Sequence, residues 1–175
     1  DSTATKRRIP NDVRNVEIPE EMKNVSLLLF VMLFAFFGCD RNSVFDQYSS
    51  MSKEQWHMDS LKYFQFNIDD SLAIYSMYLN IRNTGEYGYS NLIIFADTDL
   101  PGEKHIRDTI NCILADDKGE WLGSGFGSIW TNKIPYKTRV RFPRTGKYEL
   151  TLQHGMREEE LEGITDIGVR IEKLN

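Results

Sequence analysis

The clearest pattern in the sequence is the stretch Tyr75-Ser76-Met77-Tyr78-Leu79-Asn80-Ile81, in which apolar and polar side chains alternate. Successive side chains of a β-strand point to opposite faces of a sheet, so this alternation predicts a strand with one buried face. The same alternation recurs in residues 64–68, 138–142, 148–152 and 167–171. Residues 92–95 form a fully apolar run and residues 106–114 a mixed one, and we expect both to be strands.

Turn sequences separate the predicted strands. Leu100-Pro101-Gly102-Glu103 fits a type II turn, because Pro sets φ at the first central position and Gly accepts a positive φ at the second. Asp116-Asp117-Lys118-Gly119 fits a type I turn followed by a left-handed glycine, and residues 143–146 form a similar corner. Turns spaced roughly eight to twelve residues apart predict an all-β fold, an antiparallel β-sandwich of the jelly-roll or immunoglobulin-like kind, in one domain.

The apolar phase of the strands also predicts which side chains form the core. No segment shows a convincing helical stripe, although residues 156–161 could form one helical turn. Cys112 alternates with apolar neighbours, which favours a thiol buried as a small hydrophobic group over a reactive one. The side chains expected inside the sandwich are Phe66, Leu79, Ile81, Ile94, Cys112, Leu150, Val169 and Ile171.

A second pattern lies near the N-terminus, where the apolar stretch 25–37 ends in Gly38-Cys39. A membrane-spanning helix needs about 20 apolar residues, so this stretch is too short to span and has the length of a signal-peptide h-region. Met22-Lys23 supplies a start and a positive charge before it. We therefore interpret residues 22–38 as a lipoprotein signal peptide, with a buried segment of a cytosolic protein as the alternative.

The predicted signal peptide fixes the expected organisation of the chain. Residues 1–21 would be an upstream or disordered extension, residues 39–52 a lipidated tether carrying one short strand, and residues 53–175 the β-sandwich domain. The thiol of Cys39 would carry a thioether-linked lipid, and two or more acyl chains make such an anchor stable. We expect a lipid-anchored protein of the cell envelope, in the outer membrane and facing the periplasm.

Charge and side-chain chemistry exclude several classes of function. The net charge is −5 without a basic cluster, which argues against a nucleic-acid partner. His57, His105 and His154 have no metal-ligand spacing, and Ser124 lacks the nucleophile-elbow pattern. The aspartate pairs 69/70, 97/99 and 116/117 could be glycosidase carboxylates or calcium ligands, but turn positions are favoured for them. We predict no enzyme activity, no metal and no cofactor.

The segment 121–130 is the least regular part of the domain, since three alternating glycines lie among aromatic side chains. Glycines in a strand let another backbone or a ligand approach closely. Trp121, Phe126 and Trp130 therefore form a candidate interaction surface. The alternative, which the high average burial of tryptophan favours, is a glycine-bent loop whose aromatic side chains close one end of the sandwich.

Several blocks of the sequence, in this order and spacing, resemble the gliding-motility-associated lipoprotein family GldH of Bacteroidota. The blocks are the lipobox with Cys39-Asp40-Arg41-Asn42, residues 44–48, 79–83 and 87–92, residues 116–123, and Gly163 to Lys173. The resemblance implies a lipoprotein needed for gliding and for the associated secretion machinery, without established catalysis. It implies lipidation of Cys39 and partners among the other proteins of the gliding machinery.

Two other classes of function remain open from the residues alone. A carbohydrate-binding sandwich would use Trp56, Trp121 or Trp130 as platforms on one exposed face. A hydrolase would need two carboxylates facing each other across a cleft.

Overall fold

The computed structural model describes residues 42–102 and 104–174, and the side chains of Lys104 and Phe126 are not described. The predicted signal peptide and Cys39 lie outside these residues. The strands in the described part are β1 (Ser43–Ser50), β2 (Gln55–His57), β3 (Lys62–Ile68), β4 (Ile74–Thr84), β5 (Asn91–Leu100), β6 (Lys104–Ile113), β7 (Ser124–Phe126), β8 (Ile129–Val140), β9 (Gly146–His154), β10 (Glu160–Glu162) and β11 (Ile164–Leu174). The short 3-10 helix η1 (Ser52–Glu54) precedes β2.

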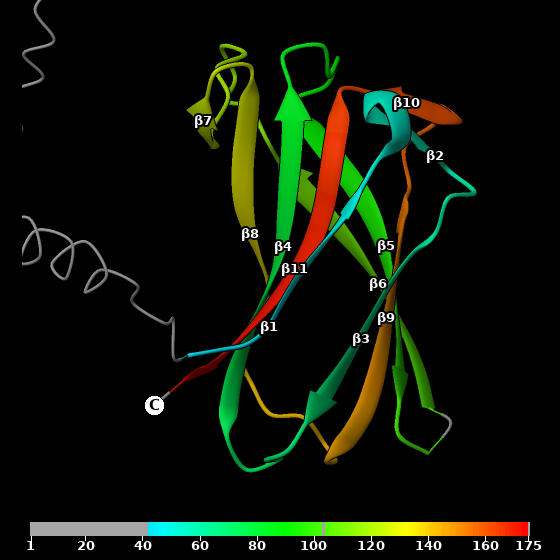
Figure 1. Ribbon diagram of the computed structural model, residues 1–175, viewed down its shortest axis with the longest axis vertical. Helices are drawn as coiled ribbons and strands as arrows, with labels where there is room; N and C mark the ends of the chain where they lie inside the picture. Colours follow the sequence, from blue (N-terminus) through cyan, green and yellow to red (C-terminus); the bar gives the residue numbers. More distant parts are fainter. Residues whose placement is uncertain (1–41, 103, 175) are drawn as a thin grey trace, which may run out of the picture. The chain divides into compact units, whose positions relative to one another are not determined.

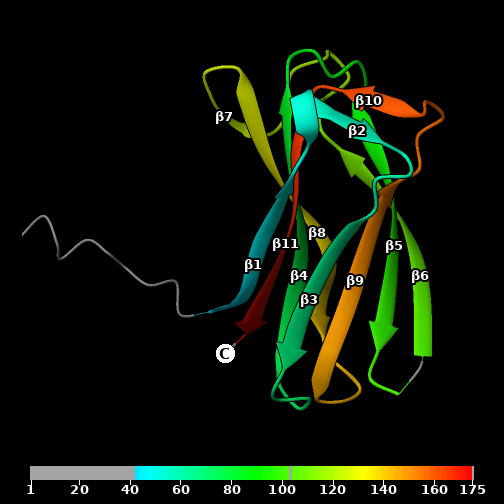
Figure 2. The same ribbon diagram turned by 45° about the vertical axis from the view of Figure 1, so that its right-hand side comes forward.

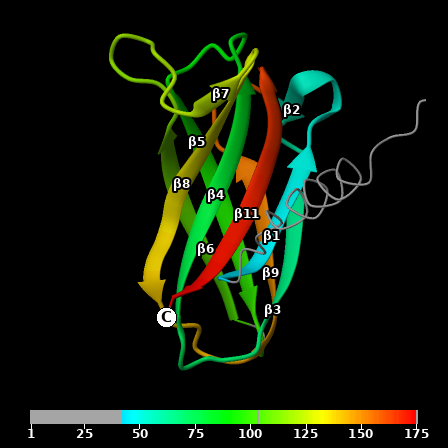
Figure 3. The same cartoon turned by 60° about the vertical axis from the view of Figure 1, so that its left-hand side comes forward.

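Two antiparallel sheets pack face to face (Figure 1). One has the strand order β1-β11-β4-β8-β7 and the other β3-β9-β5-β6, while β10 and β2 form a small ribbon at one end. The second sheet lies behind the first in Figure 3, and Figure 2 shows the two layers from another side. This arrangement confirms the predicted all-β antiparallel sandwich. Among the described residues no helix is long and apolar enough to cross a membrane.

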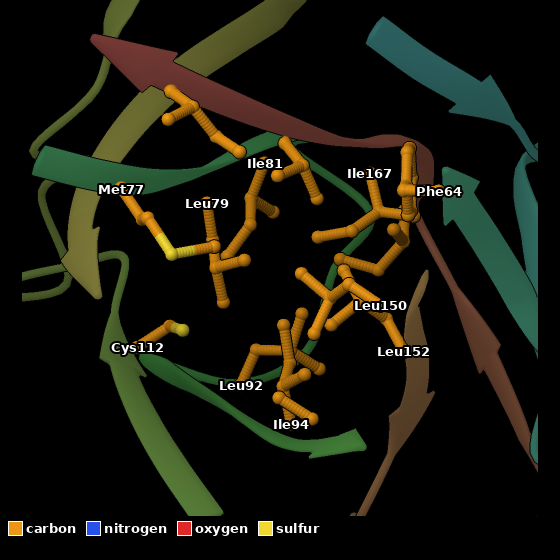
Figure 4. Packing of buried hydrophobic residues seen from close by; sticks show 14 of the residues in the cluster. Phe64, Met77, Leu79, Ile81, Leu92, Ile94, Cys112, Leu150, Leu152 and Ile167 are labelled. Carbon is orange, nitrogen blue, oxygen red and sulfur yellow. The ribbon is translucent and has the colours of Figure 1, made fainter. Parts of the chain in front are cut away.

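The alternating stretch that predicted the first strand lies at the centre of its sheet, in β4. Leu79 pairs with Val169 of β11 on one side and with Ile134 of β8 on the other. Leu79 is fully buried because its face of the strand meets the opposite sheet. Every side chain predicted for the core is buried, and Figure 4 shows most of them converging between the two sheets.

Cys112 is a buried free thiol, as expected from its alternation with apolar residues. It lies opposite Leu92 in the β5–β6 ladder. Burial disfavours the thiolate and raises the pKa of Cys112 to about 12. The thiol therefore stays protonated at neutral pH.

The predicted strand 138–142 was wrong in its bounds, because β8 begins at Ile129 and ends at Val140. Pro135 and exposed Lys133 obscure the alternation inside this strand. Both are tolerated because β7 pairs only with the first three residues of β8, so the rest is an edge within the described sheet. The register also shifts opposite Tyr75 and Met77, which breaks the two-residue period.

Two further segments differ from their predicted form. The segment 39–52, expected to be a tether with one short strand, contains the eight residues of β1, which pair with β11 along the sheet edge. Within the described residues the sheet thus begins at Ser43 and not after residue 52. The helical turn considered possible at 156–161 does not form, because residues 160–162 form β10 and pair with β2.

Candidate functional site

One end of the sandwich collects the aromatic residues of the segment singled out above. We call it the aromatic end and define it by Tyr87, Tyr89, Trp121 and Trp130, together with the loops that carry the first three and lead into β8, which carries Trp130. These loops run between β4 and β5 and between β6 and β8, at the end of the molecule that also holds β7 and β10 (Figure 1).

A tight hairpin positions Trp121. The side chain of Asp116 accepts hydrogen bonds from the backbone N–H groups of Lys118 and Glu120, both at 2.9 Å. Gly119 adopts φ +84° and donates its N–H to the Asp116 carbonyl, as the predicted turn requires. Ala115 and Trp121 form a bridge across this hairpin. The turn reading of this aspartate pair is therefore confirmed, and the turn fixes where the indole lies.

The glycines of the segment 121–130 have packing roles. A Cβ at Gly125 would lie 3.0 Å from the Trp130 ring, and one at Gly123 would lie 2.8 Å from the Thr131 carbonyl oxygen. The contact at Gly123 is shorter than real Cβ contacts, and the one at Gly125 is tighter than most of them, so glycine at these positions lets the segment approach β8 and the indole closely.

The aromatic side chains form a continuous row across this end. Ring centroids are 5.7 Å apart for Tyr89 and Tyr87, 6.4 Å for Tyr87 and Trp121, and 5.8 Å for Trp121 and Trp130. Tyr87 is buried and donates its hydroxyl to the Asn91 carbonyl at 2.8 Å. Both tryptophans are half-buried, so each presents apolar surface to solvent, and Trp121 also packs against the core.

Exposed aliphatic side chains continue the apolar character of this end. Leu122, next to Trp121, is 60% exposed, and Ile129, next to Trp130, is 38% exposed. Ile113, at the end of β6, is 47% exposed. Sequence reasoning found the tryptophans but missed these aliphatic residues, because their exposure depends on where the hairpins lie.

An acidic cleft of about 490 Å³ adjoins the aromatic row. It runs between the loop that carries Tyr87 and the strand β10, and its lining includes Glu86, Glu158, Glu160 and Glu162. The hydroxyl of Tyr89 donates to Glu158, and this bond raises the pKa of Tyr89 above its usual value. The aromatic end therefore combines apolar rings with negative charge.

Trp56 is not an exposed platform, which corrects one of the residues considered for glycan binding. Its side chain is fully buried, and its indole N–H donates to the Ser60 carbonyl at 2.9 Å. The ring packs edge-on against His154 with centroids 5.4 Å apart. Trp56 is a core residue, and only the two half-buried tryptophans reach the surface.

The remaining candidate residues are placed as follows. His154 is buried beside Trp56, and burial lowers the pKa of this histidine. His105 lies on the surface between the carboxylates of Asp99, at 2.8 Å, and Asp97, at 3.1 Å. These two aspartates lie on β5 and not in a turn, so the turn reading was wrong for them.

The other candidate groups have structural partners. Asp70 caps the backbone N–H groups of Leu72 and Ala73, in agreement with its predicted turn position. Ser124 begins β7. Within residues 42–102 and 104–174 no group of three histidine, cysteine or acidic side chains is arranged to hold a metal ion.

Comparisons with known proteins agree with the blocks quoted from the sequence. The family described as GldH lipoprotein matches residues 43–171. The protein named gliding motility lipoprotein GldH homolog of Christiangramia forsetii is 40% identical over 156 residues, which cover 85% of this chain and 95% of that protein. The gliding motility lipoprotein GldH of Flavobacterium johnsoniae is 35% identical over 159 residues, which cover 87% of this chain and 98% of that protein.

Solved structures add little to this comparison. The infectious bursal disease virus Gx strain and the VP2 subviral particle of the same virus align with 79% of this chain at 13% and 15% identity, each with a TM-score of 0.32. This chain spans only 36% and 37% of the length of those chains. A likeness this small carries no argument about function.

Proposed function

This chain belongs to the GldH lipoprotein family, and on that premise we propose that it is a lipid-anchored accessory component of the gliding motility and associated secretion machinery. It acts by protein–protein interaction and not by catalysis. Its anchor is a lipid on Cys39, and it sits in the outer membrane and faces the periplasm.

The observation that supports a protein–protein interaction is the row of aromatic rings at the aromatic end. Trp121 and Trp130 contact each other, remain half-exposed and have exposed aliphatic neighbours in the sequence. Tryptophan is enriched among the residues that dominate binding at protein interfaces. The aromatic end is therefore the docking surface.

The charge beside the docking surface indicates the chemistry of the partner. Glu86, Glu158, Glu160 and Glu162 line the cleft next to Tyr87 and Tyr89. Negative potential favours a positively charged partner and speeds its encounter. The partner presents an apolar side chain to the tryptophans and lysine or arginine side chains to the cleft.

The test replaces Trp130 with alanine and measures spreading motility, secretion and the amount of the protein in cells that lack the native copy. Trp130→Ala should abolish motility while the protein stays abundant, because truncating an interface tryptophan commonly costs about 2 kcal/mol or more of binding energy. Tyr63→Ala is the matched control, since Tyr63 is also aromatic and is 60% exposed on β3. Cells that carry this control variant should glide normally.

Two results would contradict the proposal. A stable Trp130→Ala protein that supports full motility would show that the aromatic end does not dock the partner. Loss of the protein together with loss of motility would assign the ring to stability alone. Cys39→Ser should separately lose labelling by an alkyne fatty acid, and unchanged labelling would place the lipid elsewhere.

A further inference from the structure

The end of the sandwich opposite the aromatic end is rich in unpaired cations. We call it the basic end and define it by residues 69–73, 101–102 and 139–147. Arg139, Arg141, Arg144 and Lys147 are all exposed there. None of the four forms an ion pair with a carboxylate among the described residues. They present uncompensated positive charge to solvent.

The carboxylates of the basic end have other partners than its arginines. Asp70 pairs with the ammonium group of Lys173 at 2.9 Å, and Asp69 accepts a hydrogen bond from the side-chain amide of Asn67. On β5, next to this end, Asp99 pairs with His105 at 2.8 Å. The pKa of Asp70 is lowered, chiefly by its hydrogen bond with Lys173, so it stays ionised in that pair. These acidic groups therefore do not offset the arginines of the 139–147 segment through direct contact.

An apolar side chain projects from the same end. Leu72 is 82% exposed, more than any other large hydrophobic side chain in the described part of the chain. Its backbone is held in place, because its N–H donates to Asp70 at 3.0 Å and its carbonyl accepts from the Nε of Arg141 at 3.1 Å. The loop therefore holds Leu72 outward beside a cation, which is the pairing found where proteins contact a lipid interface.

The covalent path from the proposed anchor leads to this end. The carbonyl of Asn42 accepts a hydrogen bond from the backbone N–H of Lys173 at 2.9 Å, and Lys173 in turn pairs with Asp70 in the Leu72 loop. Two residues lie between Cys39 and Asn42 in the sequence, and the three chain steps that join them can span at most about 11 Å when extended. In Figure 1, β1 begins beside the C-terminus, on the half of the molecule that carries the 69–73 loop.

We infer that the basic end rests on an anionic lipid surface, with Leu72 inserted at the level of the headgroups and the 139–147 cations over the lipid phosphates. The inference rests on the proposed lipid anchor at Cys39 and adds the orientation of the domain. Each lysine or arginine near an anionic membrane strengthens the contact by about five-fold. The aromatic end then points away from the membrane, toward the partner.

The experiment uses the full chain, purified as the lipidated protein and reconstituted into vesicles of equal parts phosphatidylcholine and phosphatidylglycerol. One variant carries Leu72→Cys and a second carries Leu122→Cys, each labelled with an environment-sensitive fluorophore. Leu122 is the matched control, since it is also an exposed leucine but lies at the aromatic end. Cys112 does not compete for the label, because it is buried and protonated.

The label at position 72 should be quenched by phospholipids that carry a nitroxide in the upper acyl chain, and the label at position 122 should not. Arg144→Gln with Lys147→Gln should lower the ratio of docked to undocked protein by about five-fold for each charge removed. Lys118→Gln with Arg157→Gln removes two exposed charges from the opposite end and should leave quenching unchanged. Circular dichroism checks that each variant is folded.

Four results would overturn the inference. In a protein that carries its lipid, absent quenching at both positions would mean that the domain stands off the membrane, and equal quenching at both would mean that it has no preferred orientation. The anchor itself would remain valid in either case. Equal quenching at position 72 in pure phosphatidylcholine would overturn the assignment to anionic lipid. A mass spectrum without a lipid on Cys39 would instead refute the anchor, and with it the orientation.

Discussion

The aromatic end and the basic end close the same two sheets in different ways. The aromatic end is built from long connections, whose rings pack against one another and against the core beside an acidic cleft. The basic end is built from short turns that project arginine side chains and Leu72 into solvent. Since loops carry function on a rigid scaffold, this difference is what we would expect if the two ends make the two separate contacts proposed above.

Each end nevertheless contains a buried tyrosine that ties a loop to the backbone. The hydroxyl of Tyr87 donates to the Asn91 carbonyl at 2.8 Å, and that of Tyr148 donates to the Arg144 carbonyl at 2.7 Å. The scaffolds are therefore comparable, and what differs is the surface that each loop presents. Substitutions made in matched pairs can test this contrast.

The largest expected difference between the two ends concerns a glycine at each. Gly163→Ala should cost about 2–5 kcal/mol of folding free energy, because its φ of +81° is strained for alanine and its Cβ would lie 2.3 Å from the Tyr87 nitrogen. Gly102→Ala has a similar φ of +90°, but its Cβ would meet only the flexible end of Arg144, so about 1–2 kcal/mol is expected. Denaturant unfolding measures both, and equal costs would show that the two ends are packed alike.

Cys112 tests the core on the β5–β6 side of the aromatic end. Cys112→Ser should cost about 1–3 kcal/mol, because a hydroxyl would be buried among apolar side chains. Cys112→Ala is the matched control, since it loses similar volume without adding a polar group. If serine and alanine lower the melting temperature equally, the site supplies a hydrogen-bond partner and the interpretation of a purely apolar pocket is wrong.

The two tyrosines should behave alike. Tyr87→Phe and Tyr148→Phe each remove one hydrogen bond to a backbone carbonyl, so each should cost about 0.5–1.5 kcal/mol. Thermal unfolding of both variants measures the effect. A cost confined to one of them would mean that the other loop is held by its remaining contacts.

The smallest expected effects are those of pH on two histidines. Burial, aided by His57, lowers the pKa of His154 below its usual 6.5. Near this pH the unfolded chain therefore binds a proton at His154 more readily than the folded chain does. The contribution of His154 to the free energy of unfolding is complete above pH 6.5. It is lost as the pH falls through the pKa that His154 has in the folded protein. The Asp99 and Asp97 carboxylates raise the pKa of His105, so its contribution is complete below pH 6.5 and is lost as pH rises through the folded pKa.

Melting temperatures measured between about pH 8 and pH 5 separate these two effects. His154→Phe should reduce the fall in melting temperature as the pH drops below 6.5. His105→Gln should reduce the fall in melting temperature as the pH rises above 6.5. A wild-type protein whose stability does not change over this range would contradict both signs.

Much of the fold followed from residue patterns, and the failures have identifiable causes. Alternation placed Leu79, Ile81 and Val169 in the core correctly, because a strand with one buried face must repeat every two residues. The start of β8 was missed because Pro135 and the bulges opposite Met77 interrupt that repeat. The aromatic segment was recognised only as unusual, since its composition is compatible with either a docking surface or a core closure.

The sequence by itself determined the all-β class, the turns and the identity of the core residues, because these depend on local periodicity and on local backbone preferences. It also carried the family, through blocks spread along the chain. Only the tertiary structure decided that Trp56 is buried while Trp121 and Trp130 reach the surface, and that Tyr87 joins them in one row. It alone brought Leu72 beside Arg141. Those contacts join residues far apart in sequence, and the register and packing of two sheets fix them, which no local pattern records.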